Sequence, residues 1–206
     1  MSDSRWEKRD HVDQDTLLRV LGETSDVLDR TGIPYVFIGG LPLSVYGRPK
    51  PIKDLDVMVR HEDVEKTMQV LADAGFETKD APEEWLHKAA KDGVLVDVIT
   101  RSEGDLYLDD ELLGRALERD YKGRNVKLVG PEDLLVMKAI AHEEDTPHYW
   151  HDAMALIVGV ELDWDYIVQR ARHGAKRLLS LLIYAQSTDL FVPDETIDEL
   201  YRSVYR

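Results

Sequence analysis

The chain contains 206 residues, of which 43% are hydrophobic and 33% are charged, and this balance is typical of a globular protein with one sizeable core. Its formal net charge of −15 comes from 26 basic and 41 acidic residues. So acidic a surface disfavours long non-specific contact with DNA or RNA because it repels phosphate, whereas a cationic small molecule or a protein partner is compatible with it. The absence of cysteine excludes disulfides and thiolate zinc sites.

The first twelve residues are polar and lack the apolar core of a signal peptide, so we expect a flexible leader over residues 1–12. No apolar run reaches the length of a membrane span, which leads us to expect a cytoplasmic location and no membrane partner. Leucine and valine recur at helical spacing from Gln14 to Asp29, and this pattern predicts an amphipathic first helix.

A glycine pair follows a short apolar run, Tyr35–Ile38, that is typical of a buried strand. Gly39 and Gly40 lack Cβ atoms, so the backbone can turn sharply there and a ligand can approach its N–H groups closely. Residues 41–46 have room for a short helix whose first N–H groups would favour phosphate. Ser44, within that turn, is either a further phosphate ligand or simply a small helix residue.

Two carboxylates stand two positions apart in the next predicted strand, Asp54 to Val59. Pro49 and Pro51 force extended chain into it. Because a strand alternates faces with period two, Asp54 and Asp56 leave the same face, roughly 7 Å apart. Such a pair is costly without a cation between its members, and Mg²⁺ (or Mn²⁺) takes oxygen ligands of this kind.

A third aspartate, Asp97, lies in the apolar run Val94–Ile99. After a predicted helix (62–74) and a short strand (76–78), residues 85–90 and 94–100 flank Asp92-Gly93, which is typical of a β-hairpin. Asp97 is either a structural aspartate or a metal ligand. A buried carboxylate without a partner is expensive, which favours the metal ligand on a strand beside Asp54 and Asp56.

Taken together, the glycine pair, the Asp-x-Asp strand and the later aspartate resemble the nucleotidyltransferase superfamily. The resemblance implies an α+β, polymerase-beta-like fold: a mixed β-sheet flanked by helices, followed by a helical C-terminal part. We expect the core over residues 13–130 and the helical part, packed on it, over residues 131–206. The superfamily often has Gly-Ser where this chain has Gly39-Gly40.

Beyond the hairpin, residues 105–117 suggest a loop and a short helix, and Lys122–Asn125 a turn between strands. Gly130-Pro131 predicts a helix start. That helix carries Lys138 among apolar residues. The spacing of Leu134 and Lys138, followed by Asp152, resembles abortive-infection and toxin–antitoxin nucleotidyltransferases, and implies that Lys138 and Asp152 bind nucleotide. The alternative for Lys138 is a surface lysine on the back of the helix.

Two further groups of residues leave alternatives open. His142, His148 and His151 lie near Glu143, Glu144 and Asp145; a zinc site is conceivable, but we expect solvated loop histidines. Three helices are predicted after Asp163. Their basic patch either steers a tRNA end or a nucleotide tail or supplies helix-end cations paired with nearby acids; it contains Arg170, Arg172, His173, Lys176 and Arg177.

The resemblance implies metal-dependent transfer of a nucleoside monophosphate from an NTP to an acceptor. Asp54, Asp56 and Asp97 would hold magnesium, Gly39 and Gly40 the phosphates, and Lys138 the charge on pyrophosphate. The expected acceptor is a tRNA end or a protein, with a possible cognate toxin or antitoxin partner. The alternatives are antibiotic-type modification of a small molecule, or a catalytically silent nucleotide-binding or partner-binding module.

Overall fold

The computed structural model describes residues 6, 12–80, 84–143, 145–172 and 174–205, and most of the predicted leader, residues 1–5 and 7–11, lies outside them. Within the described chain, the strands form one seven-stranded mixed sheet in the order β3-β4-β5-β2-β1-β7-β6. Their bounds are β1 Tyr35–Ile38, β2 Asp54–Val59, β3 Glu77–Asp80, β4 Leu86–Lys91, β5 Val94–Ile99, β6 Leu117–Tyr121 and β7 Arg124–Leu128.

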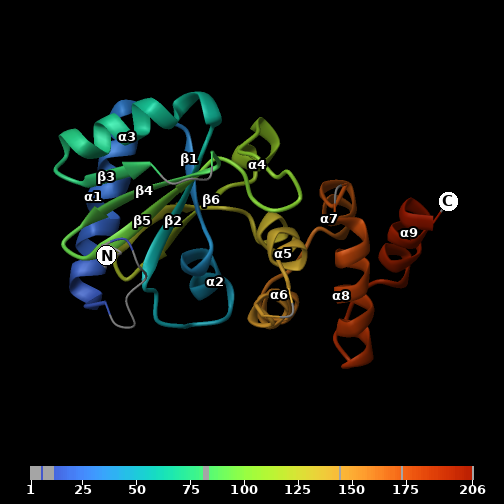
Figure 1. The fold of residues 1–206 in the computed structure, drawn as a ribbon. Helices are drawn as coiled ribbons and strands as arrows, with labels where there is room; N and C mark the ends of the chain where they lie inside the picture. The colour runs from blue at the N-terminus through green and yellow to red at the C-terminus, as the bar shows by residue number, and fades with distance from the viewer. Residues whose placement is uncertain (1–5, 7–11, 81–83, 144, 173, 206) are drawn as a thin grey trace.

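Helices flank this sheet and then continue away from it, with α9 farthest from the strands (Figure 1). Their bounds are α1 Gln14–Thr31, α2 Gly40–Tyr46, the 3-10 helix η2 His61–Asp63, α3 Val64–Asp73, α4 Asp110–Gly114, α5 Pro131–Ile140, α6 His148–Gly159, α7 Trp164–Arg170, α8 Ala175–Ser187 and α9 Asp194–Tyr205. The predicted mixed sheet with flanking helices and a helical C-terminal part is therefore confirmed.

The two central strands carry the acidic residues. β2 pairs with β1 in antiparallel and with β5 in parallel orientation. On β2 the alternate residues Leu55, Val57 and Val59 are fully buried, so their burial fixes the register, and the opposite face presents the aspartates. The predicted limits of β1 and β2 agree with the structure.

Hairpin turns set the position of the outer strands. Asp92 and Gly93 both have positive φ, 50° and 80°, between β4 and β5, and Lys122 and Gly123, at 52° and 84°, do the same between β6 and β7, as a two-residue hairpin turn requires. One detail of the prediction is wrong: Leu117 begins β6 and does not belong to a helix, because its pairing with Leu128 across the hairpin decides its conformation.

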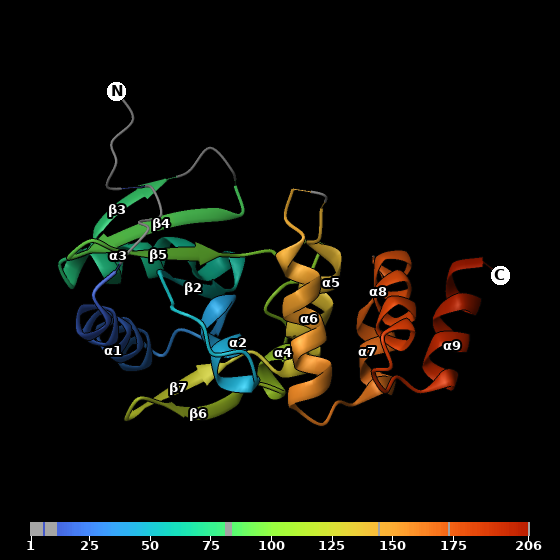
Figure 2. The same cartoon turned by 90° about the horizontal axis from the view of Figure 1, so that it is seen from below.

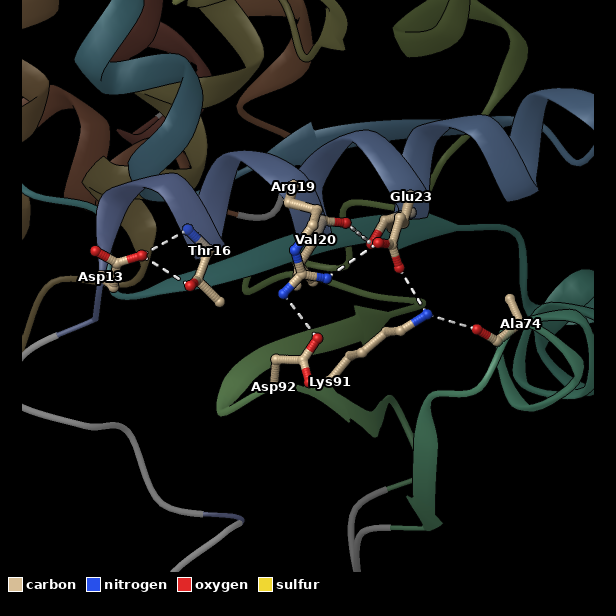
Figure 3. Close-up of polar contacts among 9 residues, drawn as sticks. Asp13, Thr16, Arg19, Val20, Glu23, Ala74, Lys91 and Asp92 are labelled. Atoms are coloured by element: carbon tan, nitrogen blue, oxygen red, sulfur yellow. Dashed lines mark hydrogen bonds and ion pairs between the residues drawn. The ribbon is translucent and has the colours of Figure 1, made fainter.

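Helix α1 is tied to the β4–β5 hairpin by polar contacts (Figure 3). Arg19 donates to Asp92 at 2.7 Å, and the Lys91 ammonium lies 2.6 Å from a Glu23 carboxylate oxygen while donating to the Ala74 carbonyl at 2.7 Å. These contacts are partly exposed and contribute little stability each, but they fix where the hairpin, and with it strand β5, lies relative to α1.

Helices α5 and α6 pack on each other and on α2, and Figure 2 shows them between the sheet and α7–α9. The approach of α6 to α2 depends on two glycines. A Cβ at Gly159 would lie 2.5 Å from the Tyr46 carbonyl oxygen, and one at Gly47 would lie 3.1 Å from the Gly159 Cα. The two backbones therefore touch where a side chain would separate them. In the described residues, no helix combines the length and apolarity needed to cross a membrane.

Candidate active site

Three carboxylates meet on adjoining strands. Asp56 on β2 is the direct register partner of Asp97 on β5, and Asp54 lies two residues before Asp56. One oxygen atom from each of the three can be chosen so that all lie within 4.8 Å of one another. Asp97 is buried, at 5% exposure. Three carboxylate oxygens at this spacing are a donor set that suits a hard divalent cation such as Mg²⁺.

The residue beside this cluster has to be glycine. Gly39 has φ +71°, in the left-handed region that L-residues avoid. A Cβ there would lie 2.0 Å from the Asp56 carboxylate oxygen Oδ2. Gly39 thus ends β1 and lets the Asp56 carboxylate lie directly against the backbone turn.

A lysine neutralises one member of the cluster. Lys88 on β4 is the cross-strand partner of Asp97, and its Nζ donates to Asp97 Oδ1 at 3.2 Å. Lys88 is partly buried, with 21% of its side chain exposed. Its ammonium supplies a counter-charge to the buried Asp97 carboxylate.

A cavity of about 500 Å³ opens beside the carboxylates; we call it the central cavity. It lies between the sheet and helices α5 and α6, and this volume is in the range of small-molecule sites. Its lining residues include Gly39, Gly40, Lys50, Lys53, Asp54, Asp56, Lys138, His148 and Tyr149. The predicted glycines, two of the aspartates and the lysine therefore share one cavity.

Lys138 is 8% exposed and lines this cavity, so the alternative of a surface lysine on the back of the helix is wrong. Its ammonium lies 4.6 Å from the centre of the Tyr149 ring. Burial lowers the pKa of Lys138, and the nearby Asp152 carboxylate partly opposes that shift. The α5 helix thus presents a buried cation toward the acidic cluster.

Asp152 is fully buried and gathers three cations. Its carboxylate accepts hydrogen bonds from Arg48 and, at 3.0 Å, from Lys50, and it lies 3.5 Å from the Lys138 Nζ. We call Arg48, Lys50, Lys138 and Asp152 the cation cluster. The Asp152 carboxylate thus holds three side-chain cations close to one another.

The sequence reasoning missed Arg48 and Lys50. A signal was available in the segment Arg48-Pro49-Lys50-Pro51, which alternates cations with prolines just before Asp54. The prolines restrict the backbone and present the two cations from extended chain. What could not be seen is that α6, about a hundred residues later, would supply the carboxylate that they share.

The structure does not bring Ser44 to this cavity. Ser44 is not among the residues that line the central cavity; it lines a neighbouring cavity together with Val12, Gln14 and Tyr121. The expectation of solvated loop histidines is met in part. His148 and His151 are exposed but lie in the first turn of α6; His142 lies in the loop, is half-buried and stacks on Trp150 with ring centroids 4.4 Å apart. Glu144 lies outside the described residues.

Two arginines of the basic patch in the C-terminal helices make structural contacts. Arg170 is buried and bonds Asp133 at 2.7 Å and Asp109 at 2.6 Å. Arg177 donates to the carbonyls of Ile140 and His142 at the end of α5. For both arginines these contacts confirm the second alternative, a helix-end cation paired with nearby groups. His173 lies outside the described residues.

The fold, with its three strand-borne carboxylates beside a glycine turn, defines a nucleotidyltransferase. A family described as uncharacterised nucleotidyltransferases matches residues 8–188, and the chain belongs to this family. None of the curated proteins compared with the chain matches it.

Two solved structures share the fold. An antigenic nucleotidyltransferase-like protein from Paracoccidioides brasiliensis is 16% identical, with a TM-score of 0.54 over 92% of this chain and 94% of that one. The antibiotic-resistance factor ANT(2'')-Ia is 15% identical, with a TM-score of 0.53 over 86% of this chain and 95% of that one. The narrower resemblance to the toxin–antitoxin type stays a prediction.

Proposed function

We propose that the protein transfers a nucleoside monophosphate from an NTP to an acceptor hydroxyl with the help of divalent magnesium or manganese. The observation that carries this proposal is the meeting of Asp54, Asp56 and Asp97, with oxygens within 4.8 Å, beside a cavity that Lys138 also lines. Carboxylates for metal and a cation for phosphate are the two requirements of the reaction. A reaction that consumes NTP fits the cytoplasmic location expected from the sequence.

Each residue has a distinct task in this reaction. Asp54 and Asp56 would hold the metal, which supplies charge neutralisation at the attacking and leaving oxygens. Asp97 would complete that site and accept the proton of the acceptor hydroxyl. The acceptor oxygen then bonds to the α-phosphorus as the bond to the bridging oxygen breaks, and pyrophosphate leaves with that electron pair.

Lys50 and Lys138 of the cation cluster would bind the leaving pyrophosphate. Lys50 and Lys138 line the cavity, and Asp152 fixes both ammonium groups. Cations held in place before the reaction stabilise developing negative charge without reorganising. Gly39 and Gly40 line the same cavity and would allow the phosphates to approach the backbone closely.

The test is label transfer from an α-labelled NTP in the presence of Mg²⁺, with total tRNA, lysate protein and small molecules as acceptors. Asp56→Asn keeps the size of the side chain but removes its charge, and we expect it to abolish transfer while circular dichroism shows an unchanged fold. Asp15→Asn, on the exposed side of α1, is the matched control. Transfer retained by Asp56→Asn overturns the proposal.

A further inference from the structure

A second cavity, of about 680 Å³, adjoins the central cavity; we call it the adjoining cavity. It is lined by the loop after β5, by Trp85 before β4 and by the loop between α5 and α6. The two cavities share five lining residues: Ile38, Ile99, Ser102, Ala141 and Tyr149. They are therefore two compartments of one open space.

The adjoining cavity begins next to the reaction centre. Ile99 lines it and stands two residues beyond Asp97 on the same strand. Residues two apart leave the same face of a strand, about 7 Å from each other. A molecule in this cavity can therefore place a hydroxyl beside Asp97 while the rest of it extends away from the triphosphate.

The two compartments differ in charge. In the central cavity three lysines outnumber two aspartates among the lining residues, which include Lys50, Lys53, Lys138, Asp54 and Asp56. In the adjoining cavity acidic residues are in excess: Glu103, Asp105 and Glu143. Arg101 also lines the adjoining cavity, but it lies 3.2 Å from Asp105 and neutralises that residue. Glu103 and Glu143 then give the described lining a net negative charge.

Aromatic rings complete the adjoining cavity. Trp85 and Tyr149 line it together with the apolar Ile38 and Ile99. An aromatic face attracts a cation, most strongly where water is partly excluded, and an apolar wall holds the ring of a sugar or cyclitol. The volume lies within the 300–1,000 Å³ typical of small-molecule sites.

We propose that the adjoining cavity is the acceptor site and that it takes a cationic, hydroxyl-bearing small molecule such as an amino sugar or aminocyclitol. This proposal rests on the proposed function and specifies its acceptor. The ammonium groups lie near Glu103 and Glu143, the ring lies against Trp85 and Tyr149, and one hydroxyl faces Asp97. The same negative charge disfavours a nucleic-acid acceptor, since it repels phosphate.

The first experiment measures binding without nucleotide, so that it does not depend on catalysis. The probe is kanamycin A, a polyhydroxylated polyamine, and its fully N-acetylated derivative keeps the hydroxyls but lacks the charges. By titration calorimetry we expect the amine form to bind at least about tenfold more tightly, a preference that weakens as salt is added. Equal affinity for the two forms overturns the proposal.

A double variant locates the site. Glu103→Gln/Glu143→Gln removes both charges with little change in shape, and we expect it to weaken kanamycin binding about tenfold. In label transfer it should raise the KM for kanamycin and leave the KM for NTP unchanged. The matched control, Glu65→Gln/Glu195→Gln, removes two exposed charges on α3 and α9, and an equal effect in it contradicts the proposal.

The outcomes separate this proposal from the proposed function. If Mg²⁺-dependent NTP binding is present in a thermal-shift assay but label goes only to tRNA or protein, the acceptor proposal fails and the proposed function stands. If kanamycin binds through Glu103 and Glu143 but no NTP binds and no label transfers, the proposed function fails. The adjoining cavity would then still be a binding site for a cationic molecule.

Discussion

Gly39 and Asp56 are so close that no other amino acid fits at position 39: a Cβ there would lie 2.0 Å from the Asp56 carboxylate oxygen. The glycine turn and the metal-binding strand are therefore a single arrangement. We expect Gly39→Ala to displace the Asp56 carboxylate and to abolish label transfer.

Gly32→Ala is the control that separates the backbone strain of an alanine with positive φ from the contact of its Cβ with Asp56. Gly32 has a similar φ, +67°, but nothing lies within 4 Å of its added Cβ. Gly32→Ala should lose about 1–2 kcal/mol of unfolding free energy from left-handed strain. Gly39→Ala should lose more, because its added Cβ also meets the Asp56 carboxylate; urea denaturation measures both losses. Only Gly39→Ala should lose transfer; equal activity of the two variants would show that the close contact is unimportant.

The Lys88 contact predicts a metal-dependent change in stability. Lys88→Met removes the ammonium that lies 3.2 Å from Asp97, leaving three neighbouring carboxylates with less compensation. In EDTA we expect the Tm to fall by about 2–4 °C, the shift that about 1 kcal/mol causes in a chain of this size. Mg²⁺ should then raise the Tm of Lys88→Met more than that of the wild type.

The outcome is measured by differential scanning calorimetry, with Lys176→Met, an exposed lysine of α8, as control. A Mg²⁺-induced shift in Lys88→Met that is no larger than in the wild type would rule out Lys88 as the counter-cation of the metal site.

Removing the Asp152 carboxylate should shift the pH dependence of kcat/KM for NTP. Burial lowers the pKa of Lys138, and Asp152 opposes that shift, so removing the carboxylate lowers the pKa further. Lys138 then loses its proton at a lower pH, and with it its charge for pyrophosphate. In Asp152→Asn we expect the alkaline limb of kcat/KM for NTP to move to lower pH. An unmoved limb would mean that Lys138 acts without Asp152.

Lys50 predicts a selective loss of nucleotide binding. It lines the central cavity and is held by Asp152 at 3.0 Å. Lys50→Met should raise the KM for NTP about tenfold, as expected for one lost charge-assisted contact, while the Tm stays within about 2 °C. Lys176→Met again serves as control and tests the basic patch: an equal rise in KM would favour the patch as a nucleotide site.

Removing Arg170 should lower the stability of the protein without changing its transfer activity. It bonds Asp133, which is fully buried and also accepts hydrogen bonds from the Tyr166 hydroxyl. Arg170→Met therefore leaves a buried carboxylate without its counter-charge, at a cost of about 3–5 kcal/mol. Adding Asp133→Asn should recover part of that loss. Urea denaturation measures both. Transfer per folded molecule should equal that of the wild type, and a specific defect with tRNA instead would revive the tRNA-steering interpretation.

Much of the fold could be predicted because local patterns decide it. A continuous apolar run before two glycines predicted β1, and alternating residues after two prolines predicted β2. The Asp92-Gly93 turn predicted the hairpin whose second strand places Asp97 beside Asp56. Single-residue roles were harder. Nothing in the local sequence shows that Ser44 does not line the central cavity. The conformation of Leu117 is decided by its partner across a hairpin.

The cation cluster could not be predicted as a unit because its members come from three separate segments. Arg48 and Lys50 precede β2, Lys138 lies on α5 and Asp152 on α6. We therefore propose that residue 130 marks a change from sheet to helices along the chain and not a division between independent units, since residues on both sides of it line the central cavity.

The contact between Gly47 and Gly159 offers a way to read related sequences. Because a Cβ at Gly159 would strike the Tyr46 carbonyl, any relative with a larger residue there has to hold its two helices farther apart. Its counterpart of Asp152, two turns earlier on α6, would then lose reach of the arginine that follows Gly47. These two positions in an alignment divide homologues into two groups: those that can assemble the same cation cluster, and those that have to bind their nucleotide through other residues.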